Sequence, residues 1–147
     1  MQGKHAQYFE ATLQLRNPSE EILDFVQNEI EKADIHIAKT VELKNGLDHY
    51  LSDNNFAKTL GKKLQQQFGG ELTVTASLYS RKDGRDIYRL TVLFRALQFK
   101  KGDIVNFKGE NYEIKNIDKE IFLQKVKTNE KIRVKYKDMQ QLKEARE

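Results

Sequence analysis

The chain has 147 residues, no cysteine and a formal net charge of +4 at pH 7. This length suggests one domain or two small ones, and the absence of an apolar run of about 18 residues argues against a membrane span. Without cysteine the chain cannot form a disulfide, a thiolate zinc site or a cysteine nucleophile.

The first half of the chain reads as a mixture of strands and helices. In chain order the patterns predict a strand, a helix, two strands joined by a turn, and a second helix, over residues 8–16, 18–33, 35–43, 47–51 and 54–68. Asn17 is the expected N-cap of the first helix because Pro18 follows it. Asp53 is the expected cap of the second helix, which Gly69-Gly70 ends.

A hairpin is predicted next. Two alternating runs, residues 72–78 and 90–96, must turn their apolar faces to the same core, because cross-strand partners share a face. This requirement pairs Leu78 with Leu90 and centres the turn on Gly84. The opposite face is polar, with arginine, tyrosine and threonine side chains that could contact RNA. Ordinary cross-strand pairing toward solvent is the alternative for that face.

Residues 98–147 read as consecutive short hairpins, which are typical of a small barrel. The first hairpin is expected to turn at Gly109-Glu110. The second needs an odd loop, Thr128-Asn129-Glu130, for Val126 and Ile132 to face the same core. That register puts four basic side chains together on the outer face: Lys125, Lys127, Lys131 and Arg133.

The positive charge lies in this same segment. Residues 98–147 hold 13 basic and 9 acidic residues, whereas residues 1–97 are neutral overall. A short basic segment favours a polyanion as partner over an acidic small molecule. A solvated, lysine-rich surface is the alternative that charge alone leaves open.

Catalytic signals are weak. No histidine among His5, His36 and His49 stands at metal-ligand spacing with another histidine or a carboxylate. Gly61-Lys62-Lys63 lacks the earlier glycine of a phosphate-binding loop. The sequence therefore predicts neither an enzyme nor a small-molecule substrate.

Five segments, in order along nearly the whole chain, resemble one protein family. They are YFEATLQLR at residues 8–16, GLDHY at 46–50, the helix at 57–70, the hairpin RKDG…YRLTV at 81–92, and FKKGDIV at 99–105. The family is nonsense-mediated mRNA decay protein 3, the large-ribosomal-subunit export adaptor, in its archaeal form.

The resemblance implies an α+β fold with two domains. Residues 1–97 would form a mixed α/β domain like that of a ribosomal protein, with the order β-α-β-β-α-β-β. Residues 98–147 would form a small all-β SH3-like barrel similar to that of initiation factor 5A. The family begins with a cysteine-rich zinc region, and because this chain has no cysteine, no zinc or other cofactor is expected in it.

The resemblance also implies a non-enzymatic factor that binds the large ribosomal subunit near the tRNA E site, in subunit maturation or export. Its partners would be rRNA and ribosomal proteins, with no membrane, in the cytoplasm, and with nuclear shuttling only in a eukaryotic member that carries an export tail. A protein-interaction module with a solubilising basic face is the alternative. The residues expected to contact rRNA are Lys125, Lys127, Lys131, Arg133, Lys135, Lys100 and Lys101. The second candidate face comprises Tyr79, Arg81, Arg89 and Arg95.

Overall fold

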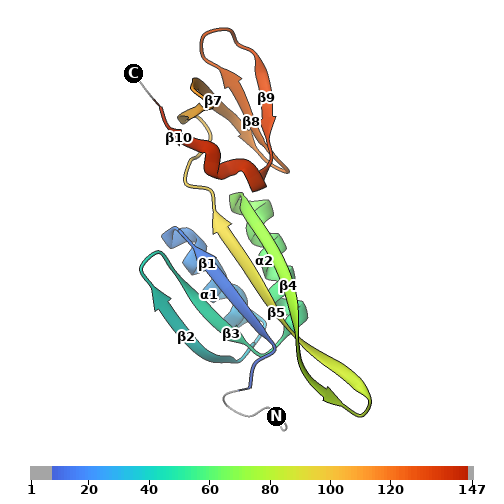
Figure 1. Ribbon diagram of the computed structural model, residues 1–147. Helices are drawn as coiled ribbons and strands as arrows, with labels where there is room; N and C mark the ends of the chain where they lie inside the picture. The colour runs from blue at the N-terminus through green and yellow to red at the C-terminus, as the bar shows by residue number, and fades with distance from the viewer. Residues whose placement is uncertain (1–7, 146–147) are drawn as a thin grey trace.

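The computed structural model describes residues 8–145, apart from the side chain of residue 82, and arranges them in two five-stranded sheets (Figure 1). The fold is therefore mixed α/β, with strands predominating. In chain order the elements are β1 Ala11–Arg16, α1 Glu20–Lys32, β2 Ile37–Leu43, β3 Gly46–Leu51, α2 Asn54–Phe68, β4 Gly70–Lys82, β5 Arg85–Ala96, β6 Ile104–Phe107, β7 Glu110–Ile117, β8 Ile121–Lys125, β9 Lys131–Val134, the 3₁₀ helix η1 Tyr136–Gln141, and β10 Leu142–Glu144.

The first sheet is built around its N-terminal strand. Its order is β2-β3-β1-β5-β4, and β1 pairs antiparallel with β3 and parallel with β5. Both α-helices cover one face of this sheet (Figure 1), where β1 contributes the fully buried Leu13 and Leu15. The other face carries no helix, as is common where one side of a sheet meets solvent.

The two helices start differently from one another. Ser19, and not Asn17, caps α1, since the Ser19 hydroxyl accepts a hydrogen bond from the backbone N of Ile22 at 3.2 Å. The predicted Asn17 cap is wrong because that residue adopts a left-handed φ of 55° and turns the chain before the helix. The predicted Asp53 cap is confirmed. Within the described residues, neither helix is long and apolar enough to cross a membrane.

The hairpin of β4 and β5 extends past the rest of the first sheet as a two-stranded arm (Figure 1). Leu78 pairs with Tyr88, so the predicted pairing with Leu90 is wrong by two residues. An even shift preserves which side chains share a face, so the predicted common apolar face is confirmed. Its predicted burial against one core is wrong for the arm, where Val74 and Leu78 are 38% and 57% exposed. The turn is Asp83-Gly84, where both residues have positive φ as a type I′ turn requires. A bulge at Tyr79 takes up the odd residue.

The second sheet has the order β10-β6-β7-β8-β9 and a separate core. β9 and β10 are its edges, and no pairing within residues 8–145 joins them, so the predicted SH3-like barrel is not confirmed. The turn between β6 and β7 is Lys108-Gly109, one residue earlier than predicted, again with positive φ at both positions. The fully or nearly fully buried side chains of the second core include Val105, Ile114, Ile121 and Leu123.

The predicted odd loop between β8 and β9 is wrong. Leu123 pairs with Ile132, and the backbone N of Lys125 donates to the carbonyl of Glu130 at 2.7 Å, which leaves the even-length loop 126–129. Val126 therefore lies in the loop and is 53% exposed. The core does not need Val126, because other β8 side chains already fill it.

The two sheets meet where α2 ends. The backbone N of Leu97 donates to the carbonyl of Gly69 at 3.3 Å, and Gly69 lies against Ile117 and Tyr136 of the second unit. A Cβ atom on Gly69 would lie 2.6 Å from Cγ2 of Ile117, and the φ of Gly69 is +80°. Glycine is thus required at this junction for both space and backbone conformation.

Candidate nucleic-acid interface

Three cations follow the outermost strand of the second sheet. Lys131, Arg133 and Lys135, named here the β9 edge, are exposed at alternate positions, while Ile132 and Val134 between them pack toward the core. With a rise of about 3.3 Å per residue, successive cations are about 6.6 Å apart along the chain. The β9 edge is therefore a row of positive charge on one side of an edge strand.

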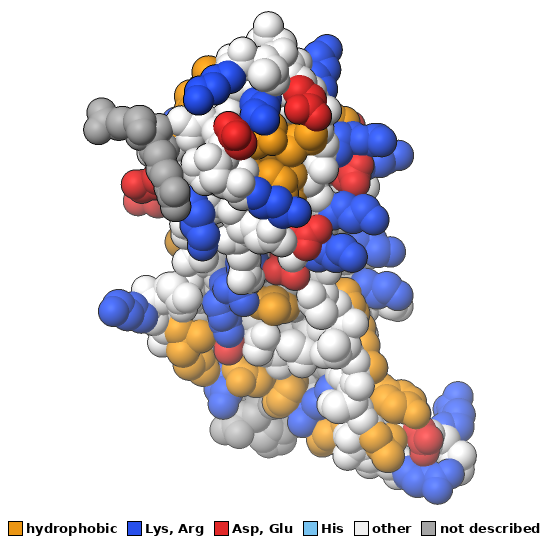
Figure 2. Space-filling view, turned by 45° about the horizontal axis from the view of Figure 1, so that its top comes forward, with side chains coloured by type: hydrophobic (Ala, Val, Ile, Leu, Met, Phe, Trp, Pro, Cys, Tyr) orange, Lys and Arg blue, Asp and Glu red, His pale blue; other side chains and the backbone are white. Residues whose placement is uncertain are grey.

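This row has little internal counter-charge. Nη1 of Arg133 lies 3.8 Å from Oε1 of Glu120, and the Arg133 side chain is 68% exposed. Lys131 and Lys135 make no ion pair with any other described residue. Figure 2 shows Lys and Arg side chains along one side of the C-terminal unit. Cations in such positions are available to phosphate oxygens.

Two of the predicted rRNA contacts lie away from this row. Lys125 on β8 pairs with the buried Tyr112 on β7, so it lies on the core face of the sheet and not on the outer face. Nζ of Lys125 lies 3.8 Å from Oε1 of Glu110. Lys127 lies in the 126–129 loop and is exposed. The even loop causes this, since it removes both lysines from the alternation that carries Lys131, so the predicted four-residue face is wrong.

The two other predicted contacts, Lys100 and Lys101, lie in the turn before β6. The backbone N of Lys100 donates to Oδ2 of Asp103 at 2.8 Å, and both lysine side chains are exposed. Neither side chain borders the surface hollows beside the β9 edge.

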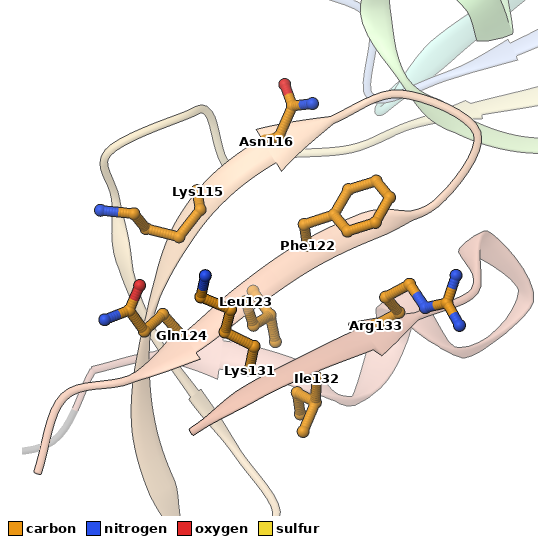
Figure 3. A pocket seen from close by; sticks show the side chains of 8 residues that line it. All are labelled: Lys115, Asn116, Phe122, Leu123, Gln124, Lys131, Ile132 and Arg133. Atoms are coloured by element: carbon orange, nitrogen blue, oxygen red, sulfur yellow. The ribbon is translucent and has the colours of Figure 1, made fainter. Parts of the chain in front are cut away.

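Two hollows border the β9 edge and share Arg133. The larger, of about 710 Å³, lies over the outer faces of β7, β8 and β9 (Figure 3) and is lined by Lys115, Asn116, Phe122, Leu123, Gln124, Lys131, Ile132 and Arg133. The smaller, of about 520 Å³, is lined by Phe107, Lys108, Glu120, Arg133, Val134, Lys135, Lys137 and Asp138. Phe122 was not among the residues predicted to contact RNA, although its position between two core residues of one strand indicates that it points outward.

The second candidate face centres on Arg89. Its Cζ lies 3.7 Å from the ring centroid of Phe9 and 3.6 Å from that of Tyr79, so the guanidinium is held between two aromatic rings. Its Nε donates to the carbonyl of Phe9 at 3.1 Å. This arginine is thus engaged within the chain, on the helix-free face of the first sheet.

The other arginines of that face differ from each other. Nε of Arg81 lies 2.9 Å from Oδ1 of Asp86, whereas the buried Nε of Arg95 lies 3.9 Å from Oε1 of Glu71 and forms no hydrogen bond within the described residues. The Arg95 side chain is 30% exposed. The structure therefore favours the β9 edge over this face as a surface for phosphate.

Within residues 8–145 no three metal-ligating side chains are grouped. The buried His49 bonds through Nδ1 to the Thr40 hydroxyl at 2.8 Å. Burial lowers the pKa of His49, and the neighbouring Asp48 opposes that effect in part. His49 is thus a satisfied histidine of the sheet.

Comparison with known proteins gives one family. The model of the second domain of NMD3 matches residues 8–95, which span the first sheet and its two helices. A search of the curated proteins finds no match. Because the family model covers more than half of the chain, the protein belongs to the NMD3 family.

Proposed function

We propose that the chain is a non-enzymatic factor that binds the large ribosomal subunit through the rRNA backbone, in subunit maturation or export. Membership of the NMD3 family supports a ribosome-related role. The observation that carries the proposal is the β9 edge, because it offers three exposed cations in a row, of which Lys131 and Lys135 lack an ion-pair partner within residues 8–145.

The binding is electrostatic. Lysine and arginine side chains on phosphate position a protein on RNA without reading its sequence, and each contact adds to the salt dependence of the affinity. Resemblance to the archaeal members supports two finer assignments: a contact near the tRNA E site, and an SH3-like barrel related to that of initiation factor 5A. The proposal places the protein in the cytoplasm and requires no cofactor.

The test is co-sedimentation of the 147-residue chain with purified large subunits over a series of salt concentrations. Lys131→Ala with Lys135→Ala should weaken binding and flatten the slope of log K against log[salt] by about 1.4–1.8 for two lost phosphate contacts. The matched control is Lys58→Ala with Lys62→Ala, which removes two exposed lysines from α2. The control should leave the slope unchanged.

Equal affinity and slope for the two double variants would show that the β9 edge is only a solvated surface. Crosslinking from the β9 edge, followed by mapping of the RNA sites, tests the location. Crosslinks to rRNA near the E site are expected, and crosslinks confined to another part of the subunit would refute that assignment.

A protein-interaction module is the second candidate, and one observation favours it. The β4–β5 arm exposes Val74, Leu78 and Tyr88 by 38%, 57% and 48%, and Figure 2 shows hydrophobic side chains along it. Exposed apolar side chains in a group are typical of protein contacts. If Leu78→Asp abolishes subunit binding while the Lys131 and Lys135 variant keeps it, the protein module is the better description.

A further inference from the structure

Phe122 is a large aromatic side chain that the proposed phosphate contacts do not use. Its neighbours along β8, Ile121 and Leu123, are buried in the second core, but Phe122 is neither in that core nor packed against it. It is half-buried on the outer face of the sheet, where its cross-strand partners are Asn116 on β7 and Arg133 on β9. A large ring in this position contributes little to the fold and leaves apolar surface to be covered.

The side chains around the ring are polar and of particular kinds. Figure 3 shows the Phe122 ring between Asn116 and Arg133, with further polar side chains toward the other end of the hollow: Lys115, Gln124 and Lys131. An aromatic ring offers a face on which a base stacks, and amide groups can donate to and accept from base edges. Arginine and lysine bind the adjoining phosphates.

The charge around the hollow is positive. Nζ of Lys115 lies 3.6 Å from Oε1 of Glu113, and Arg133 is loosely paired with Glu120 at 3.8 Å, while Lys131 has no ion pair among the described residues. The volume of about 710 Å³ falls within the usual range for small-ligand sites, about 300–1,000 Å³. Cations and an aromatic ring side by side suit a nucleotide, which carries both a phosphate and a flat base.

We propose that the Phe122 hollow binds an unpaired nucleotide of RNA, with its base stacked on Phe122 and its flanking phosphates on Lys131 and Arg133. This rests on the proposed function and adds a preference that phosphate contacts alone do not give. A duplex keeps its bases stacked on each other, so only single-stranded RNA can present a base to the ring. The protein therefore binds single-stranded segments of its RNA partner more tightly than helical ones.

The test compares a fluorescent oligouridine with an RNA duplex of the same length, by anisotropy with the 147-residue chain. Phe122→Ala should weaken oligouridine binding about 5- to 150-fold, the usual effect of losing one base–aromatic stack, and change duplex binding less than about twofold. Phe122→Leu, which keeps apolar volume without a π face, should behave as Phe122→Ala does, and Phe122→Trp should retain binding. The control is Ile104→Ala, which removes an apolar side chain, 43% exposed, that does not line the hollow.

Each outcome supports or overturns the stacking site on Phe122. Unchanged oligouridine binding by Phe122→Ala and Phe122→Leu overturns the stacking site, and the proposed function still stands if Lys131→Ala with Lys135→Ala weakens binding to large subunits. An equal loss for single strand and duplex also overturns it. Polyglutamate is the competing polyanion, and it tests for a peptide ligand. If Phe122→Ala weakens polyglutamate binding more than oligouridine binding, the hollow is a peptide site. The proposed function fails instead if the unmodified chain does not bind large subunits.

Discussion

Replacing Arg89 by alanine tests whether its stack with two rings holds the β4–β5 arm against the start of β1. The guanidinium carbon lies 3.7 Å from the Phe9 centroid and 3.6 Å from the Tyr79 centroid, and Nε donates to the Phe9 carbonyl. Each cation–π contact contributes about 0.5–1 kcal/mol where the group is partly exposed. The hydrogen bond contributes about 1 kcal/mol. Arg89→Ala should therefore lower the free energy of unfolding by about 2–3 kcal/mol.

The assay is urea denaturation followed by circular dichroism. The matched control is Arg85→Ala, at an exposed position near the tip of the same arm, and it should change the free energy of unfolding by less than about 0.5 kcal/mol. A double-mutant cycle with Tyr79→Ala should give a coupling of about 0.5–1 kcal/mol between the two side chains. If Arg89→Ala costs no more than Arg85→Ala, or if the coupling is zero within error, the guanidinium stack does not hold the arm.

Three further predictions concern pH and domain structure. Burial lowers the pKa of His49 below 6.5. The contribution of His49 to the free energy of unfolding should therefore be fully present above pH 6.5, decrease as the pH falls below that value, and level off once folded His49 is protonated. Thermal melts of His49→Gln should lack this step, while His36→Gln, at an exposed position just before β2, should keep it. Hydrogen bonds from lysine side chains lower the pKa of Glu29 below 4.5, and the bond from Lys63 has the largest effect. Its stabilisation should be present above pH 4.5 and lost as the pH falls through the lowered pKa. Between about pH 5 and about pH 3, a range that includes the ordinary pKa of glutamate, Glu29→Gln should lose less stability than the unmodified chain. Limited proteolysis should cut within residues 97–101, between the two cores, and a first cut inside either sheet would contradict the division into two units.

Three of the hairpins show how far the sequence determines register. Apolar alternation fixes which side chains share a face, but it leaves the register free to slide by two residues. That slide occurred in the β4–β5 and β6–β7 hairpins, where the turns Asp83-Gly84 and Lys108-Gly109 take the positive φ that type I′ geometry needs. The faces were predicted correctly there, and the turn positions were not.

The β8–β9 hairpin differs because one of its apolar residues is not in the core. The predicted burial of Val126 imposed an odd loop and the wrong face for Lys125 and Lys127. A lone valine beside a loop satisfies alternation but carries no information about the turn. The exposure of Lys131, Arg133 and Lys135 was predictable from alternation alone, whereas the hollow around Phe122 depends on side chains from three strands and needed their register.

The central position of β1 has a consequence for how the chain is made. Leu13 pairs with both His49 and Val92, so the strand synthesised first lacks one neighbour until residues 90–95 exist. At about 5–20 residues per second, roughly 4–16 s separate the synthesis of Leu13 from that of Val92. During that interval β1 presents an unpaired edge, and its long-range parallel pairing makes closure of the sheet slow relative to the helices. The first sheet therefore completes only when β5 arrives, and the C-terminal unit begins to emerge immediately afterwards.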